Sequence, residues 1–316
     1  MTKSNMYLEV PREKQINETE EYKKFSEEFD YLIDFFEGYS ELIFMNGRII
    51  SFIADKNIYT LKANIIDSSI QTLKSIKLCC SIGSFSDANT LIRKLRDDLI
   101  LYVYILNIIG LRKPFVEDDT PQFKIEMEKE VVESALNLHF NDVLTDDEQA
   151  VSAWFGNTVK ELPRRIRNKL EFENYMNVLK HNENIREILS NYNLQEYWEA
   201  LRQRLNNYVH NNGTQFVVQN IISARDKYLA THLNNINYRT AYVSSFFLVL
   251  LLMVDSSLIS STDYLDHVEC NIEPPEGCQY SIAKFVQDFI DIKVSKLHPQ
   301  LKQYLKDNNN HGMHIE

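Results

Sequence analysis

The residues best suited to chemistry lie in the segment RQRLNNYVHNNG, at positions 202–213. The segment ends an apolar-striped helical stretch and gathers a guanidinium group, one imidazole and several amides: Arg204, Asn206, Asn207, His210, Asn211 and Asn212. On helical geometry Asn206, Asn207 and His210 share one face. Arg204 shares a face with Asn211, seven residues on. The result is a polar patch with one group that titrates near neutral pH.

This set of residues would suit the cleavage of RNA without a metal ion. Histidine can transfer a proton near neutral pH, and arginine can hold a phosphate. His210 would then be the general acid or base, Arg204 would stabilise the phosphate, and the ribose 2′-hydroxyl would be the nucleophile. The structural alternative is a capped helix end, because asparagine and glycine commonly end helices and a histidine there interacts favourably with the helix dipole.

A second candidate cluster consists of Arg93, Arg96 and Asp97. Arg93 and Asp97 are four residues apart, so an intrahelical ion pair worth roughly a few tenths of a kcal/mol would explain them. The functional alternative is that Arg93 or Arg96 leans toward the His210 end of the bundle and that Asp97 orients it. The sequence leaves both interpretations open.

Positive charge is densest in residues 160–169, KELPRRIRNK, in a chain whose formal net charge is −11. The five basic residues are Lys160, Arg164, Arg165, Arg167 and Lys169. They could follow an RNA backbone, because phosphate neutralisation dominates nonspecific affinity for nucleic acid. The alternative is a solvated helix face. The negative net charge opposes nonspecific adhesion to nucleic acid but permits a local basic groove.

No cofactor and no metal ion are expected. The sequence lacks the phosphate-binding loop, the dinucleotide fingerprint, the zinc-protease motif and the hydrolase elbow. His267, Cys270 and Cys278 could supply three zinc ligands, but their spacing fits no common zinc finger or ribbon.

An arginine followed after four to six residues by a histidine, at the end of a bundle helix, resembles the HEPN superfamily of helical ribonucleases and defence or toxin proteins. Five residues separate Arg204 from His210. The segment GSFSDANTLIRKLRDDLILYVYI resembles the partner segment of one HEPN branch, and Arg93 and Asp97 match its arginine and its acid. The resemblance covers about residues 57–110 and 194–232. It implies a HEPN-like four-helix core, RNA cleavage, and pairing of two motifs across a dimer.

The sequence predicts an all-α fold, a bundle of long helices with extra peripheral helices. Glycine and proline, with 8 and 7 residues, are too scarce for the turns of sandwiches and nucleotide-binding βα units. Ser84 and Asp87 resemble an N-cap with an acidic third position. Apolar residues at helical spacing predict helices at about 18–38, 57–80, 84–110, 194–209, 219–232, 238–259 and 279–296.

The expected organisation has three parts. Residues 1–56 form N-terminal peripheral helices, and residues 57–232 form the HEPN-like bundle with an acidic insertion near 115–150. Residues 233–316 form C-terminal helices that pack on the same core.

The most apolar run, Ala241–Val254, has 14 residues, whereas a membrane span needs about 20. The run therefore predicts a buried central helix and no membrane contact. The N-terminal segment has no apolar region typical of a secretory signal, and the four cysteines show no dense disulfide-like spacing. A cytoplasmic location is expected.

Two hypotheses of function follow. The first is a metal-independent endoribonuclease of HEPN type, acting in phage defence or as a toxin. It requires a homodimer, because one motif supplies one imidazole whereas cleavage needs both a base and an acid. His139 and His181 could instead supply the second imidazole within one chain. The second hypothesis is an inactive binding, scaffold or sensor protein of a defence system, with a partner protein from the same operon.

Overall fold

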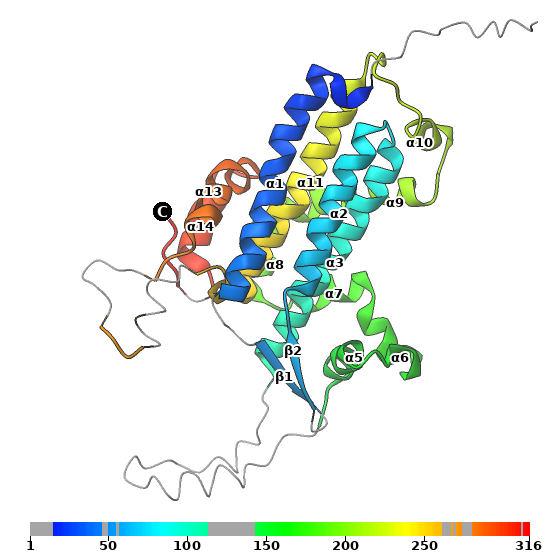
Figure 1. Cartoon of the computed structure of the whole chain (residues 1–316). Coiled ribbons are helices and arrows are strands. Elements are labelled where there is room, and N and C mark those ends of the chain that lie inside the picture. The colour runs from blue at the N-terminus through cyan, green and yellow to red at the C-terminus, as the bar shows by residue number, and fades with distance from the viewer. Residues whose placement is uncertain are drawn as a thin grey trace, which may run out of the picture.

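The computed structural model describes residues 15–45, 50–54, 57–112, 143–260, 267, 270–273, 280–310 and 312–316. These residues form an all-α fold with one two-stranded hairpin (Figure 1), which confirms the predicted fold class. His139, Cys278 and the acidic stretch up to residue 142 lie outside the described residues.

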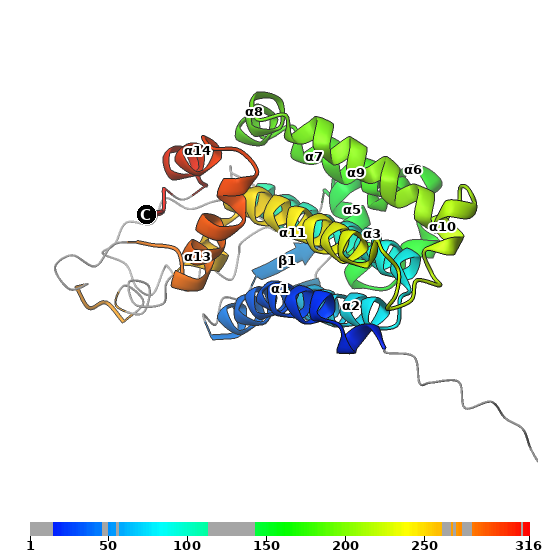
Figure 2. The same ribbon diagram turned by 90° about the horizontal axis from the view of Figure 1, so that it is seen from above.

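The helices form three layers, which are visible when the bundle is seen from one end (Figure 2). The outer layer on one side contains α1 (Glu20–Met45) and α2 (Asn64–Ser81). The middle layer contains α11 (Leu229–Val254) and α3 (Phe85–Leu111). The opposite outer layer consists of three shorter helices, α7 (Phe172–Leu179), α8 (Glu183–Asn191) and α9 (Leu194–Val209). In this outer layer α7 and α9 pack on α3, and α8 packs on α11.

The second half of helix α11 is covered on all sides because it lies between the two outer layers, and its residues are accordingly mostly apolar. Every residue from Tyr242 to Met253 is buried, which confirms the prediction of a buried helix in this run. Among the described helices, α11 is the one that is long and apolar enough to span a membrane, yet 78% of its most apolar window is buried within the protein. The central helix of a bundle has this composition.

Helix α1, in one of the outer layers, packs directly on the central helix α11 and on α2. Its residues Phe29, Phe36 and Tyr39 are fully buried. The rings of Phe36 and Tyr39 lie 5.8 and 6.0 Å from that of Phe247 in α11. The boundary expected between residues 232 and 233 falls inside α11. One continuous hydrophobic core therefore joins the three expected parts.

Helix α3 begins where the sequence predicted, but its cap is different. The Ser84 hydroxyl donates to the Asp87 carboxylate at 2.6 Å and accepts no backbone N–H. The N–H of Asp87 donates instead to the side-chain oxygen of Asn220 at 3.1 Å. The N–H of Phe85 donates to the carbonyl of Gln219 at 2.9 Å. The segment that follows α9 thus caps α3.

The helix predicted at 57–80 starts later than expected. Residues 50–61 form an antiparallel hairpin of β1 (Ile50–Ala54) and β2 (Asn57–Leu61), and α2 begins at Asn64. Phe52 and Tyr59 are directly opposite each other and their rings stack at 6.4 Å. Such cross-strand aromatic pairs stabilise a hairpin, and here they outweigh a spacing that also fits a helix.

The predictions for the last third of the chain are wrong in extent. Residues 219–228 are not helical, and α11 runs unbroken through the interruption expected near 233–237. Asn234 and Asn235 are exposed, so water satisfies their side chains without ending the helix. The helix expected at 279–296 is shorter, α13 (Lys284–Ile292), and α14 (Leu301–Asn308) follows it.

The remaining helical segments are short. Helix α5 (Asp146–Phe155) lies at the end of the predicted acidic insertion. The others are η1 (Ile16–Glu18), η3 (Val159–Glu161), α6 (Arg164–Arg167), η4 (Asn168–Leu170), α10 (Thr214–Val218), η5 (Ser256–Ile259) and η6 (Val294–Lys296).

Replacing Leu250 with aspartate is expected to unfold the protein. Leu250 is 1% exposed, and an unpaired buried carboxylate costs several kcal/mol against a total stability of about 5–15 kcal/mol. Chemical denaturation followed by circular dichroism measures the effect. Leu78→Asp is the matched control, because Leu78 of α2 is 64% exposed; it should change the free energy of unfolding by less than about 1 kcal/mol. Equal losses in the two variants would contradict the central position of α11.

Candidate functional site

Helix α9 ends in the polar segment that the sequence singled out. The N–H of His210 donates to the Asn206 carbonyl at 3.1 Å, and the N–H of Asn212 donates to the Asn207 carbonyl at 3.0 Å. Asn211 is left-handed, with φ 47°, as is common just after a helix. The Asn212 side chain also donates to the Asn207 side-chain oxygen at 3.0 Å. Asn207, Asn211 and Asn212 therefore shape the helix end.

His210 is the residue at that end whose side chain is available to a ligand. It is exposed, and no hydrogen bond or ion pair joins its imidazole to a residue that the structure describes. Asn206 is half-buried one turn earlier, and its side-chain oxygen has no hydrogen-bond partner in the described part of the chain. The His210 side chain can thus contact a ligand without breaking an internal contact.

Arg204 and His210 are not in contact within the chain. Six residues of an α-helix turn through roughly 600°, so the two side chains leave α9 on different sides. The Arg204 guanidinium lies 5.9 Å from the ring centre of Tyr208. It also lines a cavity to which His210 does not contribute. One chain therefore separates the predicted phosphate-binding group from the predicted acid or base.

The cavity beside Arg204 lies between α9 and α11 and has a volume of about 220 Å³. We call it the α9–α11 groove. Three tyrosines, two arginines and two aliphatic residues line it: Tyr197, Ala200, Leu201, Arg204, Tyr238, Arg239 and Tyr242. Tyr197 and Tyr238 are 56% and 71% exposed. None of these lining residues is a carboxylate, although the chain carries a formal charge of −11.

Arg239 is fixed in the groove by neutral partners. Its Nη1 donates to the side-chain oxygen of Asn89 and, at 3.3 Å, to the hydroxyl of Tyr208. Tyr208 in turn donates to the side-chain oxygen of Gln219 at 3.0 Å. Neither Arg239 nor Arg204 forms an ion pair with a carboxylate of the described residues. Both arginines therefore keep their positive charge for an anionic ligand.

Arg93, Arg96 and Asp97 form a separate cluster where α3 packs on α7 and α9. The Nε and Nη2 of Arg96 donate to Asp97 Oδ1 at 2.8 and 2.6 Å. The Arg96 side chain is 2% exposed, and its guanidinium lies 4.2 Å from the ring centre of Phe172. The Nε of Arg93 is 3.8 Å from the other Asp97 oxygen.

This cluster has a structural role. Burial lowers the pKa of Arg96 and raises the pKa of Asp97, and in each case the attraction between the two charges opposes the effect of burial. The pair thus stabilises a guanidinium that packing has removed from water. The Arg96 guanidinium lies over Phe172 of α7, and no hydrogen bond or ion pair joins the described side chains of Arg93, Arg96 or Asp97 to His210.

Removing the Asp97 charge is expected to destabilise the fold. Asp97→Asn would leave the buried Arg96 guanidinium without its counter-ion, at a cost of about 2–4 kcal/mol. The matched control is Asp98→Asn, because the neighbouring Asp98 pairs with Lys94 at the surface and such pairs contribute less than about 1 kcal/mol. Urea denaturation of both variants gives the comparison. A loss for Asp98→Asn as large as that for Asp97→Asn would show that burial of Arg96 is not the cause.

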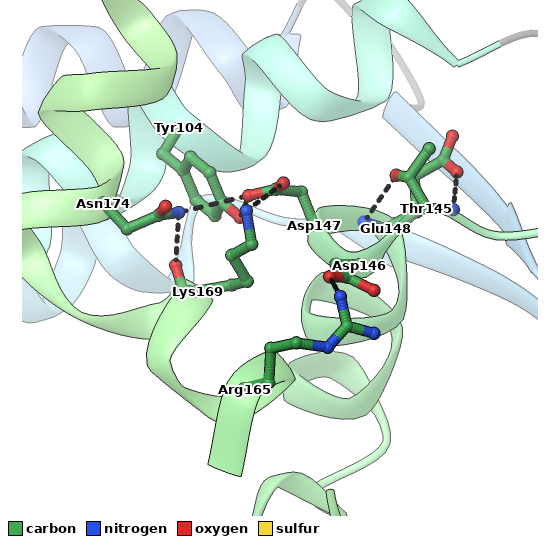
Figure 3. A network of polar contacts seen from close by, with 8 residues as sticks. All are labelled: Tyr104, Thr145, Asp146, Asp147, Glu148, Arg165, Lys169 and Asn174. Carbon is green, nitrogen blue, oxygen red and sulfur yellow. Dashed lines mark hydrogen bonds and ion pairs between the residues drawn. The ribbon is translucent and has the colours of Figure 1, made fainter. Parts of the chain in front are cut away.

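Part of the basic run at 160–169 is used within the fold. Figure 3 shows Arg165 directed at Asp146 and Lys169 at Asp147, both at the N-terminus of α5. Asp147 accepts hydrogen bonds from Lys169 at 2.9 Å and from Tyr104 at 2.8 Å. Burial alone would raise the pKa of Asp147, but these hydrogen bonds outweigh it and the pKa is lowered. Arg165 and Lys169 thus attach α6 and η4 to α5.

The other three residues of the run, Lys160, Arg164 and Arg167, are exposed and form no ion pair with a described residue. Lys160 lines a different cavity, beside the hairpin. The run does not form a single positive track, because two of its five charges are already paired.

No arrangement of three or more histidine, cysteine, aspartate or glutamate side chains that could hold a metal ion occurs in the described part of the chain. Cys278, one of the three zinc ligands considered, lies outside that part.

The chain matches no family model, no curated protein and no solved structure. The geometry of the described residues is therefore the main basis for a proposal of function.

Three residues of the groove, Tyr197, Tyr238 and Arg239, are site residues that the sequence alone does not single out. Tyr197, Leu201 and Arg204 follow the spacing of one helical face, and this signal was present in the sequence. Tyr238 and Arg239 lie just before the apolar run that begins at Ala241, and their spacing does not mark them as site residues. That these residues face α9 results from the packing of the two helices, which no local pattern encodes.

A second histidine lies at the same end of the bundle as His210. The His232 ring on α11 stacks on Phe85 at 5.2 Å, and Phe85 adjoins Gln219 through its backbone. Burial lowers the pKa of His232, although Asp226 acts in the opposite direction. Since His232 is partly packed, His210 is the more accessible imidazole.

Proposed function

We propose that this protein is a metal-independent endoribonuclease of HEPN type that acts in the cytoplasm in phage defence or as a toxin. The observation that carries the proposal is the α9–α11 groove, where two unpaired arginines and exposed tyrosines lie beside a helix that ends in an exposed, unpaired His210. The resemblance of the Arg204 to His210 segment to HEPN motifs supports the same function.

The groove has the properties of a binding site for single-stranded RNA. Aromatic side chains provide platforms for base stacking, worth about 1–3 kcal/mol per base. Tyr197 and Tyr238 expose their rings for this purpose. Arg204 and Arg239 would bind phosphates, and the lack of a lining carboxylate avoids repulsion of the RNA backbone.

Cleavage would follow the chemistry of 2′-hydroxyl attack. A base removes the proton of the 2′-hydroxyl, its oxygen bonds to the adjacent phosphorus, and the 5′-oxygen leaves with a proton from an acid. The products are a 2′,3′-cyclic phosphate and a 5′-hydroxyl end. His210 would serve as the base or the acid, and Arg204 would stabilise the negative charge on the phosphate.

Purified protein is expected to cleave single-stranded RNA in the presence of EDTA. His210→Ala should lower the cleavage rate by roughly 10² to 10⁴-fold, the usual contribution of general acid or base catalysis. Gel analysis of end-labelled RNA measures the rate and identifies the cyclic phosphate. His314→Ala is the control, because His314 is an exposed histidine beyond α14, and it should leave the rate unchanged.

The groove is tested separately from the chemistry. Arg204→Gln should weaken RNA binding about tenfold, by loss of one charge-assisted contact, whereas His210→Ala should bind RNA as the unaltered protein does. Cleavage that requires Mg²⁺, or that persists in His210→Ala, would contradict the mechanism.

A homodimer would supply the second imidazole. Exposed apolar side chains surround the turn after α10, since Val217, Val218 and Ile221 are 55%, 50% and 78% exposed. A two-fold interface is self-complementary, so it would bring two copies of the nearby α9 end together. A stable interface of this kind buries at least about 1,000 Å² in total.

Mixing chains tests whether two copies of His210 share one site. If they do, a protein equilibrated from equal amounts of unaltered and His210→Ala chains should retain about a quarter of full activity, because only unaltered pairs are active. If each chain instead carries an independent site, the mixture should retain about half of full activity. Sedimentation at micromolar concentration should show a dimer, and a fully active monomer would contradict the arrangement. The variant His232→Ala tests whether His232 of the same chain supplies the second imidazole.

The alternative function is that of an inactive binding, scaffold or sensor protein of a defence system, with a partner protein from the same operon. The position of His210 at a helix cap, away from Arg204, favours this alternative. RNA binding in the groove without cleavage in the experiments above would select it.

A further inference from the structure

A second cavity lies where the start of α2 and the end of β2 face α5 and η3. Its volume is about 570 Å³, within the range of about 300–1,000 Å³ that is usual for small-molecule sites. We call it the hairpin cavity. The lining residues that matter here are Lys62, Asn64, Trp154, Phe155, Asn157 and Lys160.

The charge of the hairpin cavity is positive. Lys62 and Lys160 come from opposite walls, one after β2 and the other in η3, and neither forms an ion pair with a described carboxylate. No aspartate or glutamate lines the cavity, and Glu161, which follows Lys160, is not among the lining residues. Two unpaired ammonium groups at one cavity repel each other, and an anion between them would replace repulsion with attraction.

The aromatic residues of the cavity are held by stacking. The Phe155 ring stacks on Tyr59 at 5.3 Å and on Phe52 at 6.2 Å, which ties the end of α5 to the hairpin. Trp154 packs edge-on against Phe155 at 5.1 Å. The left-handed residue Asn157, with φ 59°, then turns the chain toward Lys160. The same short segment, residues 154–160, therefore supplies both the aromatic ring of Trp154 and the positive charge of Lys160.

We propose that the hairpin cavity binds a nucleoside phosphate. Lys62 and Lys160 would hold the phosphate, the base would pack against Trp154, and the side-chain amides of Asn64 and Asn157 would form hydrogen bonds with the base or ribose. Lysine binds phosphate as a point charge, and aromatic rings stack on bases, so the two together suit such a ligand.

This site is distinct from the α9–α11 groove. The N-terminal end of α3 contacts Gln219, near the end of α9. After the C-terminal end of α3, Arg112 donates to the Ile53 carbonyl of β1 at 2.7 Å. Helix α3 has 27 residues, or about 40 Å, and Figure 1 shows the hairpin at the end of the bundle away from α10. The hairpin cavity and the α9–α11 groove also share no lining residue. The inference therefore does not depend on the proposed ribonuclease activity.

Titration of the full-length protein with adenosine and guanosine monophosphate tests the proposal by calorimetry and by tryptophan fluorescence. Of the two tryptophans, Trp198 is buried in the core, so a change in emission reports on Trp154. Lys62→Gln combined with Lys160→Gln should weaken binding at least about tenfold. Trp154→Phe should abolish the fluorescence change while the calorimetric signal persists. Lys24→Gln combined with Lys296→Gln, two exposed lysines of α1 and η6, is the charge-matched control and should bind as the unaltered protein does.

A ten-nucleotide RNA distinguishes a free nucleotide from a unit of an RNA chain. If the ligand is free, the lysine substitutions weaken binding of the monophosphate but not of the RNA. If it is part of RNA, the substitutions weaken both and the monophosphate competes with the RNA. Any one of three results would overturn the proposal. These are no binding of the monophosphate at millimolar concentration, equal binding of the unphosphorylated nucleoside, and monophosphate binding that the lysine substitutions leave unchanged. The RNA is added to the His210→Ala chain, so that cleavage does not interfere with the binding measurement. The monophosphate titrations involve no cleavage, so their failure is separable from failure of the ribonuclease proposal.

Discussion

The absence of a polar face on the central part of α11 is the constraint on which the rest of the structure depends. A helix that is apolar on all sides must be covered on all sides, and this requires the two outer layers. Trp198 of α9 stacks on Phe246 of α11 at 4.1 Å, and Leu205, two turns later, is fully buried. Covering α11 thus positions α9, and with it the groove and the exposed end that carries His210.

The packing of the shorter outer layer also depends on a buried charge. Arg96 extends from α3 over Phe172 of α7, and its guanidinium lies 5.9 Å from the ring of Trp198 in α9. Its Nη1 and the Trp198 Nε1 are buried without a hydrogen-bond partner among the described residues, which weakens the fold. A hydrophobic residue of similar size would avoid this cost, so the interaction contributes more to the alignment of three helices than to net stability.

The sequence predicted what its local patterns encode. The fold class, the limits of α9, the start of α3 and the burial of α11 are confirmed, because helical spacing of apolar residues is a strong signal in long elements. The hairpin was missed because β2 is short and Ile58 and Leu61 also fit a helix. Of the two arginines in the α9–α11 groove, the sequence predicted Arg204 as a site residue but not Arg239. Arg239 is held in the groove by Asn89 and Tyr208, which are distant in the sequence. Ion pairs such as Lys169 with Asp147 join segments 22 residues apart, and no periodicity indicates them.

The distribution of charge explains how an acidic chain can have sites for anions. Many of its basic side chains are paired with carboxylates, among them Lys77 with Asp30 and Arg202 with Glu173. The groove and the hairpin cavity differ because each brings together two unpaired cations and no lining carboxylate. Beyond the Debye length of about 8 Å at physiological salt, the net negative charge is largely screened, and within that distance the local cations act on an approaching anion. Local contacts rather than long-range steering therefore select the ligand at both sites.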